Sequence, residues 1–110
     1  MKISELIEKL NLEVITDKNF DNRDITGCYI GDLLSRVMSH AESGNIWITI
    51  MTNINITAVA SLTDAACIIL AENAEISKEV TDKANENDIV ILRSEKTAYE
   101  LALCVGSVLA

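Results

Sequence analysis

The stretch from Gly44 to Ala60 has the clearest hydrophobic pattern in the chain. Ile46 to Ile50 is an uninterrupted apolar run of largely β-branched residues without a charge, which predicts a strand covered on both faces. Thr52, Asn53 and Asn55 follow it, and their side-chain oxygens suit the first turn of a helix. The stretch therefore predicts a turn, a buried strand, a short polar loop and a helix start.

The rest of the second half repeats this alternation. We expect a helix from about Asn55 to Thr63, and the runs Ala66 to Leu70 and Ile89 to Leu92 predict two further buried strands. Ser77 and Ser94 stand where the two following helices need N-caps. A strand–helix alternation with short links requires right-handed crossovers, so it predicts a parallel sheet with helices on both faces.

The first half adds a helix, one or two strands and another helix to this sheet. Its first helix is predicted by apolar residues at i, i+3, i+4 and i+7, namely Ile3, Leu6, Ile7 and Leu10. Short strands are expected at 12–16 and 25–30, separated by a polar loop at 17–24, and Asp32 is expected to cap the next helix. We therefore predict one α/β domain over residues 1–110, with three layers and a mostly parallel sheet.

The charge balance narrows the classes of partner. The 110 residues include 9 Lys and Arg against 17 Asp and Glu, which gives a formal net charge of −8. Nucleic acids and anionic membranes both select clusters of Lys and Arg, so we expect neither as a partner. The three cysteines lie far apart, and the N-terminus lacks the apolar core of a signal peptide, so we expect reduced thiols in the cytoplasm.

Polar side chains at the expected carboxyl edge of the sheet are the best candidates for a binding site. Ligands of open α/β sheets bind beyond the carboxyl ends of the strands. Thr52, Asn53 and Asn55 follow one strand and Ser94 follows another, so these residues could hold an adenine nucleotide or another anion beside a helix N-terminus. Helix capping and loop solvation explain the same residues without a ligand.

No set of residues in the sequence points to catalysis, to a metal or to a cofactor. Neither of the common glycine-rich phosphate loops occurs. His40 is the only histidine and has no second histidine or cysteine nearby in sequence, so we expect no metal site. No base lies next to Cys28 in sequence, and the acidic residues form no convincing catalytic pair. We therefore expect a protein that is not an enzyme.

The last predicted helix carries more apolar side chains than a single core can cover. Ala98, Leu101, Ala102 and Val105 form a core stripe, and four further apolar residues extend it nearly all round the helix. We expect a homodimer interface formed by Leu101, Leu103, Cys104, Val108 and Leu109, because two-fold dimers are the commonest soluble oligomers. The alternative is that this helix packs wholly inside one subunit or against a different protein.

Several short stretches, taken in order, carry a resemblance to a known family. They are residues 1–7 (MKISELI), 12–15 (LEVI), 27–35 (GCYIGDLLS), 47–50 (WITI), 55–60 (NITAVA), 83–84 (KA) and 89–92 (IVIL). In this order and spacing the chain resembles the DRTGG domain family over essentially its whole length. Where we expect the family's Asp-Arg and Thr-Gly-Gly elements, this chain has Thr52-Asn53 and Ala71-Glu72-Asn73, so the role of those elements does not carry over.

The resemblance implies a fold similar to the N-terminal domain of HPr kinase and a regulatory or interaction module. Related domains lie between the CBS domains of some pyrophosphatases, and free-standing members accompany sensor-kinase-like and iron-hydrogenase genes. It therefore implies a role in signalling or in energy and redox metabolism, with a sensor-kinase-like or hydrogenase-related protein as partner. Two main hypotheses remain: a module that acts through self-association and partner binding, and a sensor for an adenine nucleotide or another anion. A third, a kinase or phosphotransferase, lacks the phosphate loop it would need.

Overall fold

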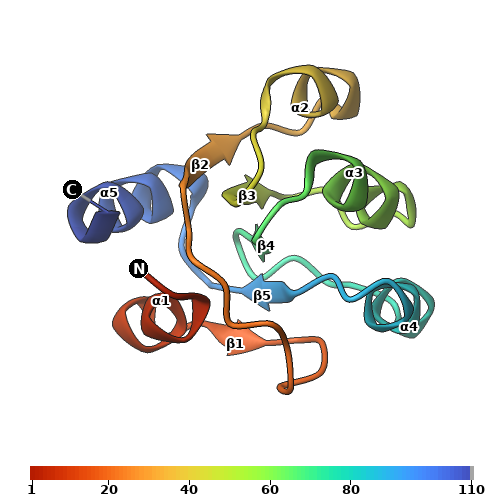
Figure 1. Cartoon of the computed structure of the whole chain (residues 1–110), viewed down its shortest axis with the longest axis horizontal. Helices are drawn as coiled ribbons and strands as arrows, with labels where there is room; N and C mark the ends of the chain where they lie inside the picture. Colours follow the sequence, from red (N-terminus) through yellow and green to blue (C-terminus); the bar gives the residue numbers. More distant parts are fainter. Residues whose placement is uncertain (110) are drawn as a thin grey trace.

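The computed structural model describes residues 1–109 and confirms the predicted α/β fold (Figure 1). Within these residues, five strands form one sheet in the order β1-β5-β4-β3-β2. The strands are β1 (Glu13–Val14), β2 (Gly27–Ile30), β3 (Asn45–Thr49), β4 (Cys67–Leu70) and β5 (Ile91–Arg93); the helices are α1 (Ile3–Leu10), α2 (Leu34–His40), α3 (Asn55–Thr63), α4 (Lys78–Glu86) and α5 (Ala98–Leu109).

The sheet is parallel except at one edge. β2, β3, β4 and β5 run parallel, since a helix connects each of them to the next. All residues of β3 and β4 are buried, as their apolar composition predicts. β1 pairs antiparallel with β5, with Glu13 beside Arg93. The sequence pattern predicted a strand near β1 but not this direction.

Helices cover both faces of the sheet. In Figure 1, α1 and α5 lie on one face, and α2, α3 and α4 lie on the other. The core is divided in the same way: Ile46 and Ile48 of β3 pack with residues of α1 and α5, whereas Trp47 packs with residues of α2, α3 and α4. Trp47 is wholly buried, and its indole Nε1 donates to the Gly31 carbonyl at 2.9 Å. This bond ties the end of β2 to β3.

Several helix ends lie where the sequence predicts them. α1 is followed by Asn11 in the left-handed conformation, with a φ of 53°, a conformation that Asn tolerates well. α3 spans Asn55–Thr63 as expected. α4 has Ser77 as its N-cap, whose side chain accepts from the Val80 N–H at 3.4 Å.

The predicted cap of α2 is wrong. α2 begins at Leu34, and its N-cap residue Leu33 makes no side-chain capping bond. Asp32 Oδ1 instead accepts from Thr49 Oγ1 at 2.7 Å and from the Ile50 N–H at 3.0 Å. The end of β3 lies beside the end of β2 and supplies these donors. The predicted strands also differ at their ends, since 12–16 reduces to Glu13–Val14, 25–30 reduces to Gly27–Ile30 and 89–92 becomes Ile91–Arg93.

Candidate functional site

Thr52, Asn53 and Asn55 lie at the carboxyl edge of the sheet, in and just after the loop between β3 and α3. Asn53 Oδ1 accepts from the Asn55 N–H at 2.9 Å, so Asn53 holds the start of the helix. Asn55 is the first helical residue and is exposed, and the N-cap position belongs to Ile54. The expected capping role of Asn55 is therefore wrong. Thr52 is half-buried.

Ser94 follows β5 at the same edge, but it does not cap α5. Its Oγ accepts from the Lys96 N–H at 3.1 Å within a tight turn. The start of α5 is held by Thr97 and Glu100, since the Glu100 N–H donates to Thr97 Oγ1 at 3.2 Å and the Thr97 N–H donates to a Glu100 carboxylate oxygen at 3.0 Å. These bonds lower the pKa of Glu100. The sequence suggested Ser94 as the N-cap because Ser94 is the first residue after β5 whose side chain can cap a helix.

The carboxyl edge contains a hollow of about 270 Å³ around Ser94, which we call the carboxyl-edge hollow. It is lined by Leu10, Asn11, Glu13, Asn73, Arg93, Ser94, Glu95 and Lys96. The guanidinium of Arg93 is already engaged, because it donates to Glu13 at 3.1 and 3.2 Å and to the Ala74 carbonyl at 3.2 Å. Thr52, Asn53 and Asn55 do not line it. The structure therefore places the four candidate residues at one edge but not in one pocket.

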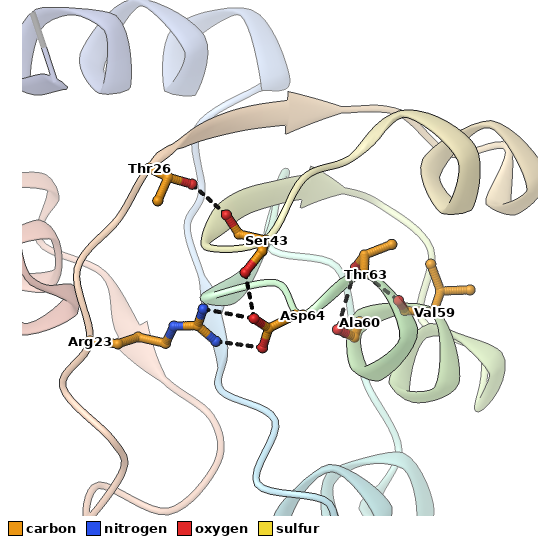
Figure 2. Close-up of polar contacts among 7 residues, drawn as sticks. All are labelled: Arg23, Thr26, Ser43, Val59, Ala60, Thr63 and Asp64. Atoms are coloured by element: carbon orange, nitrogen blue, oxygen red, sulfur yellow. Dashed lines mark hydrogen bonds and ion pairs between the residues drawn. The ribbon is translucent and has the colours of Figure 1, made fainter.

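A polar cluster that the sequence analysis missed lies at the opposite, amino edge of the sheet (Figure 2). Arg23 donates from Nη1 and Nη2 to the two carboxylate oxygens of Asp64, at 2.7 and 3.0 Å. Ser43 Oγ also donates to Asp64, and Thr26 Oγ1 donates to the Ser43 carbonyl at 2.7 Å. The Arg23 and Ser43 bonds lower the pKa of Asp64 to about 2. The cluster thus joins three segments that are distant in sequence.

The backbone around this cluster is held in special conformations. Asp64 ends α3 with a φ of 56°, and its carbonyl accepts from the Gly44 N–H at 2.8 Å. Gly44 has a φ of 82°, and a Cβ there would lie 2.7 Å from the Thr26 side chain, so only glycine fits. One sequence signal was available: Thr26-Gly27 is the only Thr-Gly pair in the chain. This pair lies before β2, whereas we expected the Thr-Gly-Gly element of the family at Ala71-Glu72-Asn73, after β4.

Beside this cluster lies a pocket of about 340 Å³, which we call the amino-edge pocket. It is lined by Thr16, Asp17, Asn19, Phe20, Asp21, Arg23, Ala65, Ala66, Asn85, Asp88, Ile89 and Val90. Three of these residues are acidic, and the single guanidinium among them is paired with Asp64. Uncompensated carboxylates repel phosphate, so this pocket is a poor site for a nucleotide.

Two of the three thiols have raised pKa values, and His40 lies within hydrogen-bond distance of two groups near the end of α2. Burial raises the pKa of the Cys67 thiol to about 12. Apolar neighbours raise the pKa of Cys28 to about 11, although Cys28 as a residue is exposed. His40 Nδ1 lies 2.7 Å from Ser39 Oγ and 3.0 Å from the Arg36 carbonyl at the end of α2. Within residues 1–109, no group of three His, Cys, Asp or Glu side chains could hold a metal ion.

The apolar residues of α5 divide between core and surface. Leu101 is wholly buried in the subunit's own core, so a partner cannot contact it. Cys104, Val108 and Leu109 are half-buried against the α1/α5 core, whereas Leu103 is exposed. Tyr99, one turn before Leu103, is also exposed and was not among the predicted interface residues. Among the described residues, no helix is long and apolar enough to cross a bilayer.

Comparisons with known proteins show what this fold is. The chain is similar in structure to the CBS and DRTGG domains of the regulatory region of Clostridium perfringens pyrophosphatase, whose structure was determined with the activator diadenosine tetraphosphate. The TM-score is 0.72 at 14% sequence identity, and the match covers 94% of this chain and 45% of the other, so this chain spans less than half of that region. No curated protein matches the sequence. The family model described as "DRTGG domain" matches residues 5–108. The chain therefore belongs to the DRTGG domain family.

Proposed function

We propose that this chain is a non-catalytic regulatory module that acts in the cytoplasm through self-association and partner binding. The observation that carries the proposal is that large apolar side chains are exposed, whereas several charged side chains are paired within the fold. Large apolar side chains, including Leu33, Tyr99 and Leu103, are exposed, whereas Arg23, Arg93 and Asp64 are committed to bonds within the fold. Large exposed apolar patches mark interaction sites in soluble proteins, and we propose that these side chains belong to such a patch.

The state of the thiols and carboxylates supports a role without catalysis. A nucleophilic cysteine needs a lowered pKa, but the pKa values of Cys28 and Cys67 are raised to about 11 and 12. The one carboxyl group with a strongly shifted pKa, Asp64, is held as an anion by Arg23 rather than poised to exchange a proton near neutral pH. The pyrophosphatase neighbour, a regulatory region, is consistent with this role.

The mass in solution and the turnover of ATP test this proposal. We expect a dimer mass by light scattering at micromolar concentration, and no release of labelled phosphate from ATP by the pure protein. A monomer at that concentration would remove self-association from the proposal. Turnover that disappears on substitution of one named side chain would show an enzyme.

The partner that we propose is a sensor-kinase-like or hydrogenase-related protein, and co-purification with such a protein from cells would support it.

A second candidate function is a sensor for an adenine nucleotide or another anion. It is favoured by the carboxyl-edge hollow, where Lys96 takes part in none of the ion pairs among the described residues. The pyrophosphatase region that this chain resembles was crystallised with a dinucleotide activator. The candidate ligand residues are Thr52, Asn53, Asn55 and Ser94, with Lys96 as the added cation.

Thermal shift with a panel of nucleotides tests the sensor hypothesis. A ligand present at a hundred times its Kd stabilises the folded state by about 2.7 kcal/mol. We expect Lys96→Ala and Ser94→Ala to reduce the shift if the ligand lies in the carboxyl-edge hollow, and Thr52→Ala and Asn53→Ala to reduce it if the ligand lies beside α3. Lys78→Ala, which removes an exposed cation on α4, is the control. A panel without any shift would remove this candidate.

A further inference from the structure

We propose that the outer edge of β2 is the surface through which two copies of this chain pair, with the two β2 strands antiparallel and the two sheets joined into one. The inference deepens the proposed function, because it rests on self-association and names where it occurs. In Figure 1, β2 lies at the end of the sheet opposite β1, with α5 on one side and α2 on the other.

The two edges of the sheet are protected very differently. Proteins normally protect an edge strand by making it short or by placing charges or proline on it. β1 is two residues long, and its Glu13 carries a charge that pairs with Arg93. β2 is four residues long, contains no charge and no proline, and among the strands of residues 1–109 pairs only with β3. Its outer peptide groups are therefore free to bond to another strand.

Exposed apolar side chains surround this edge. Cys28 and Ile30 alternate with Tyr29 and are the exposed residues of β2. Ile30 lies beside Ile48, whose face of the sheet is packed against α1 and α5. Ile50 follows on β3, and its N–H is bonded to Asp32, next to Leu33. These neighbours extend the apolar surface beyond the strand itself.

α5 contacts β2, and Tyr99 and Leu103 are exposed side chains of this helix. The exposed fractions of Ile30, Ile50, Leu103, Leu33 and Tyr99 run from 44% to 71%. A stable interface removes about 800 Å² from each partner. A pair of four-residue strands is too small for that, so the proposed interface must also bury side chains next to the end of β2, such as Leu33 and Ile50.

The alternation of side chains along β2 determines which residues can lie opposite each other when β2 pairs with its own copy. Residues directly opposite in an antiparallel pair point to the same side of the sheet. A two-fold axis can therefore pass only beside a residue, which places Cys28 opposite Cys28, or Tyr29 opposite Tyr29 with Cys28 opposite Ile30. In both registers the exposed side chains of the two strands, Cys28 and Ile30, lie on the same face of the joined sheet.

Charge favours a second copy over a different partner. The chain has a net charge of −8, so two copies repel one another wherever acidic side chains face each other. The β2 edge carries no charged side chain and is a place where two copies can approach without that repulsion. A basic protein would find no acidic side chain on β2 with which to pair.

Light scattering over a dilution series tests the edge with a matched pair of variants. Ile30→Lys puts a charge into the apolar interface in either register, and with Tyr29 opposite Tyr29 it also brings two like charges within roughly 9 Å of each other. We therefore expect it to raise the dimer Kd by about tenfold or more. Leu62→Lys makes the same change on α3 at a side chain that is 74% exposed, and we expect the Kd of that variant to be unchanged. Urea unfolding of both variants checks that each is folded.

Cross-linking of the native protein supplies a test that needs no destabilising variant. Cys28 is the exposed cysteine, whereas Cys67 is buried and Cys104 is half-buried. In either register the two Cys28 Cα atoms lie within roughly 9 Å of each other. A short cross-linker with two thiol-reactive ends should therefore link two chains, at alkaline pH because the thiolate is the reactive form. Cys28→Ser should abolish the product, and Cys104→Ser should leave it.

The outcomes separate this inference from the proposed function. A parent protein that is monomeric at micromolar concentration would overturn both the β2 pairing and self-association. A dimer that Ile30→Lys does not weaken, or that Cys28 does not link, would overturn the β2 pairing alone and leave self-association through another face. A peptide or another protein bound at β2 by a monomeric parent would also contradict the second copy as occupant.

Discussion

Asp64 is a single residue whose environment makes the fold sensitive to acid. The bonds from Arg23 and Ser43 lower its pKa from an ordinary 3.8 to about 2. A depressed pKa in the folded state contributes stability that is present above about pH 4 and is lost as the pH falls towards 2. We therefore expect the free energy of unfolding to fall across this window, as measured by urea unfolding at a series of pH values.

Asp64→Asn is the matched variant for this prediction. Asn tolerates the left-handed conformation of residue 64, which has a φ of 56°, so the backbone is not strained. The variant should show a shallower loss of stability between pH 4 and 2, because it removes the titrating group. The Asp64 side chain is largely exposed, so we expect a cost at neutral pH of no more than about 1 kcal/mol. Parallel pH curves for parent and variant would contradict the assignment.

Trp47 is the largest of the wholly buried side chains. Trp47→Ala should cost roughly 3–5 kcal/mol in the free energy of unfolding, because it leaves a large cavity and removes the bond to the Gly31 carbonyl. Trp47→Phe should cost less, since it keeps most of the packing and loses the bond. Leu62→Ala removes a large side chain that is 74% exposed on α3 and serves as the control. Urea unfolding that shows no difference between Trp47→Ala and the parent would contradict the placement of β3.

Among the helices and strands, the sequence predicted the interiors well and the ends less well. The interior of an element is specified by its own apolar period, as in Ile3–Leu10 or in the uncharged run of β3. An end depends on which donor lies nearest in space. Asp32 bonds to Thr49 and Ile50, 17 and 18 residues away, and no local pattern indicates that choice.

The start of α3 offers a test at the scale of one element. Because Asn53 Oδ1 accepts from the Asn55 N–H, Asn53→Ala should cost about 1 kcal/mol in the free energy of unfolding. The side chain of Asn55 caps nothing, so Asn55→Ala should be close to neutral. Thermal or urea unfolding of the two variants distinguishes them. The reverse order of cost would restore Asn55 as the cap and contradict the geometry of this loop.

For the whole molecule, the order of elements and the parallel sheet followed from the sequence, but the polar cluster and the pockets did not. The strand–helix alternation predicted that β2 to β5 run parallel, whereas the structure supplied their order across the sheet. Arg23 and Asp64 are 41 residues apart, and each is an ordinary surface residue by local pattern. Likewise, the sequence could not show that β4 separates Ser94 from Thr52, because the sheet order decides it.

The position of β1 and α1 has a consequence for the route by which this protein folds. β1 pairs with β5, and Glu13 bonds to Arg93, 80 residues later in the chain. α1 lies beside α5 on the same face (Figure 1). Contacts between segments so distant in sequence form slowly, because a long loop must close first. During synthesis the apolar side of α1, with Ile3, Leu6 and Leu10, leaves the ribosome before α5 has been made. It stays uncovered until α5 can pack beside it. The nascent chain, rather than the finished protein, is then the form most open to proteases and to aggregation.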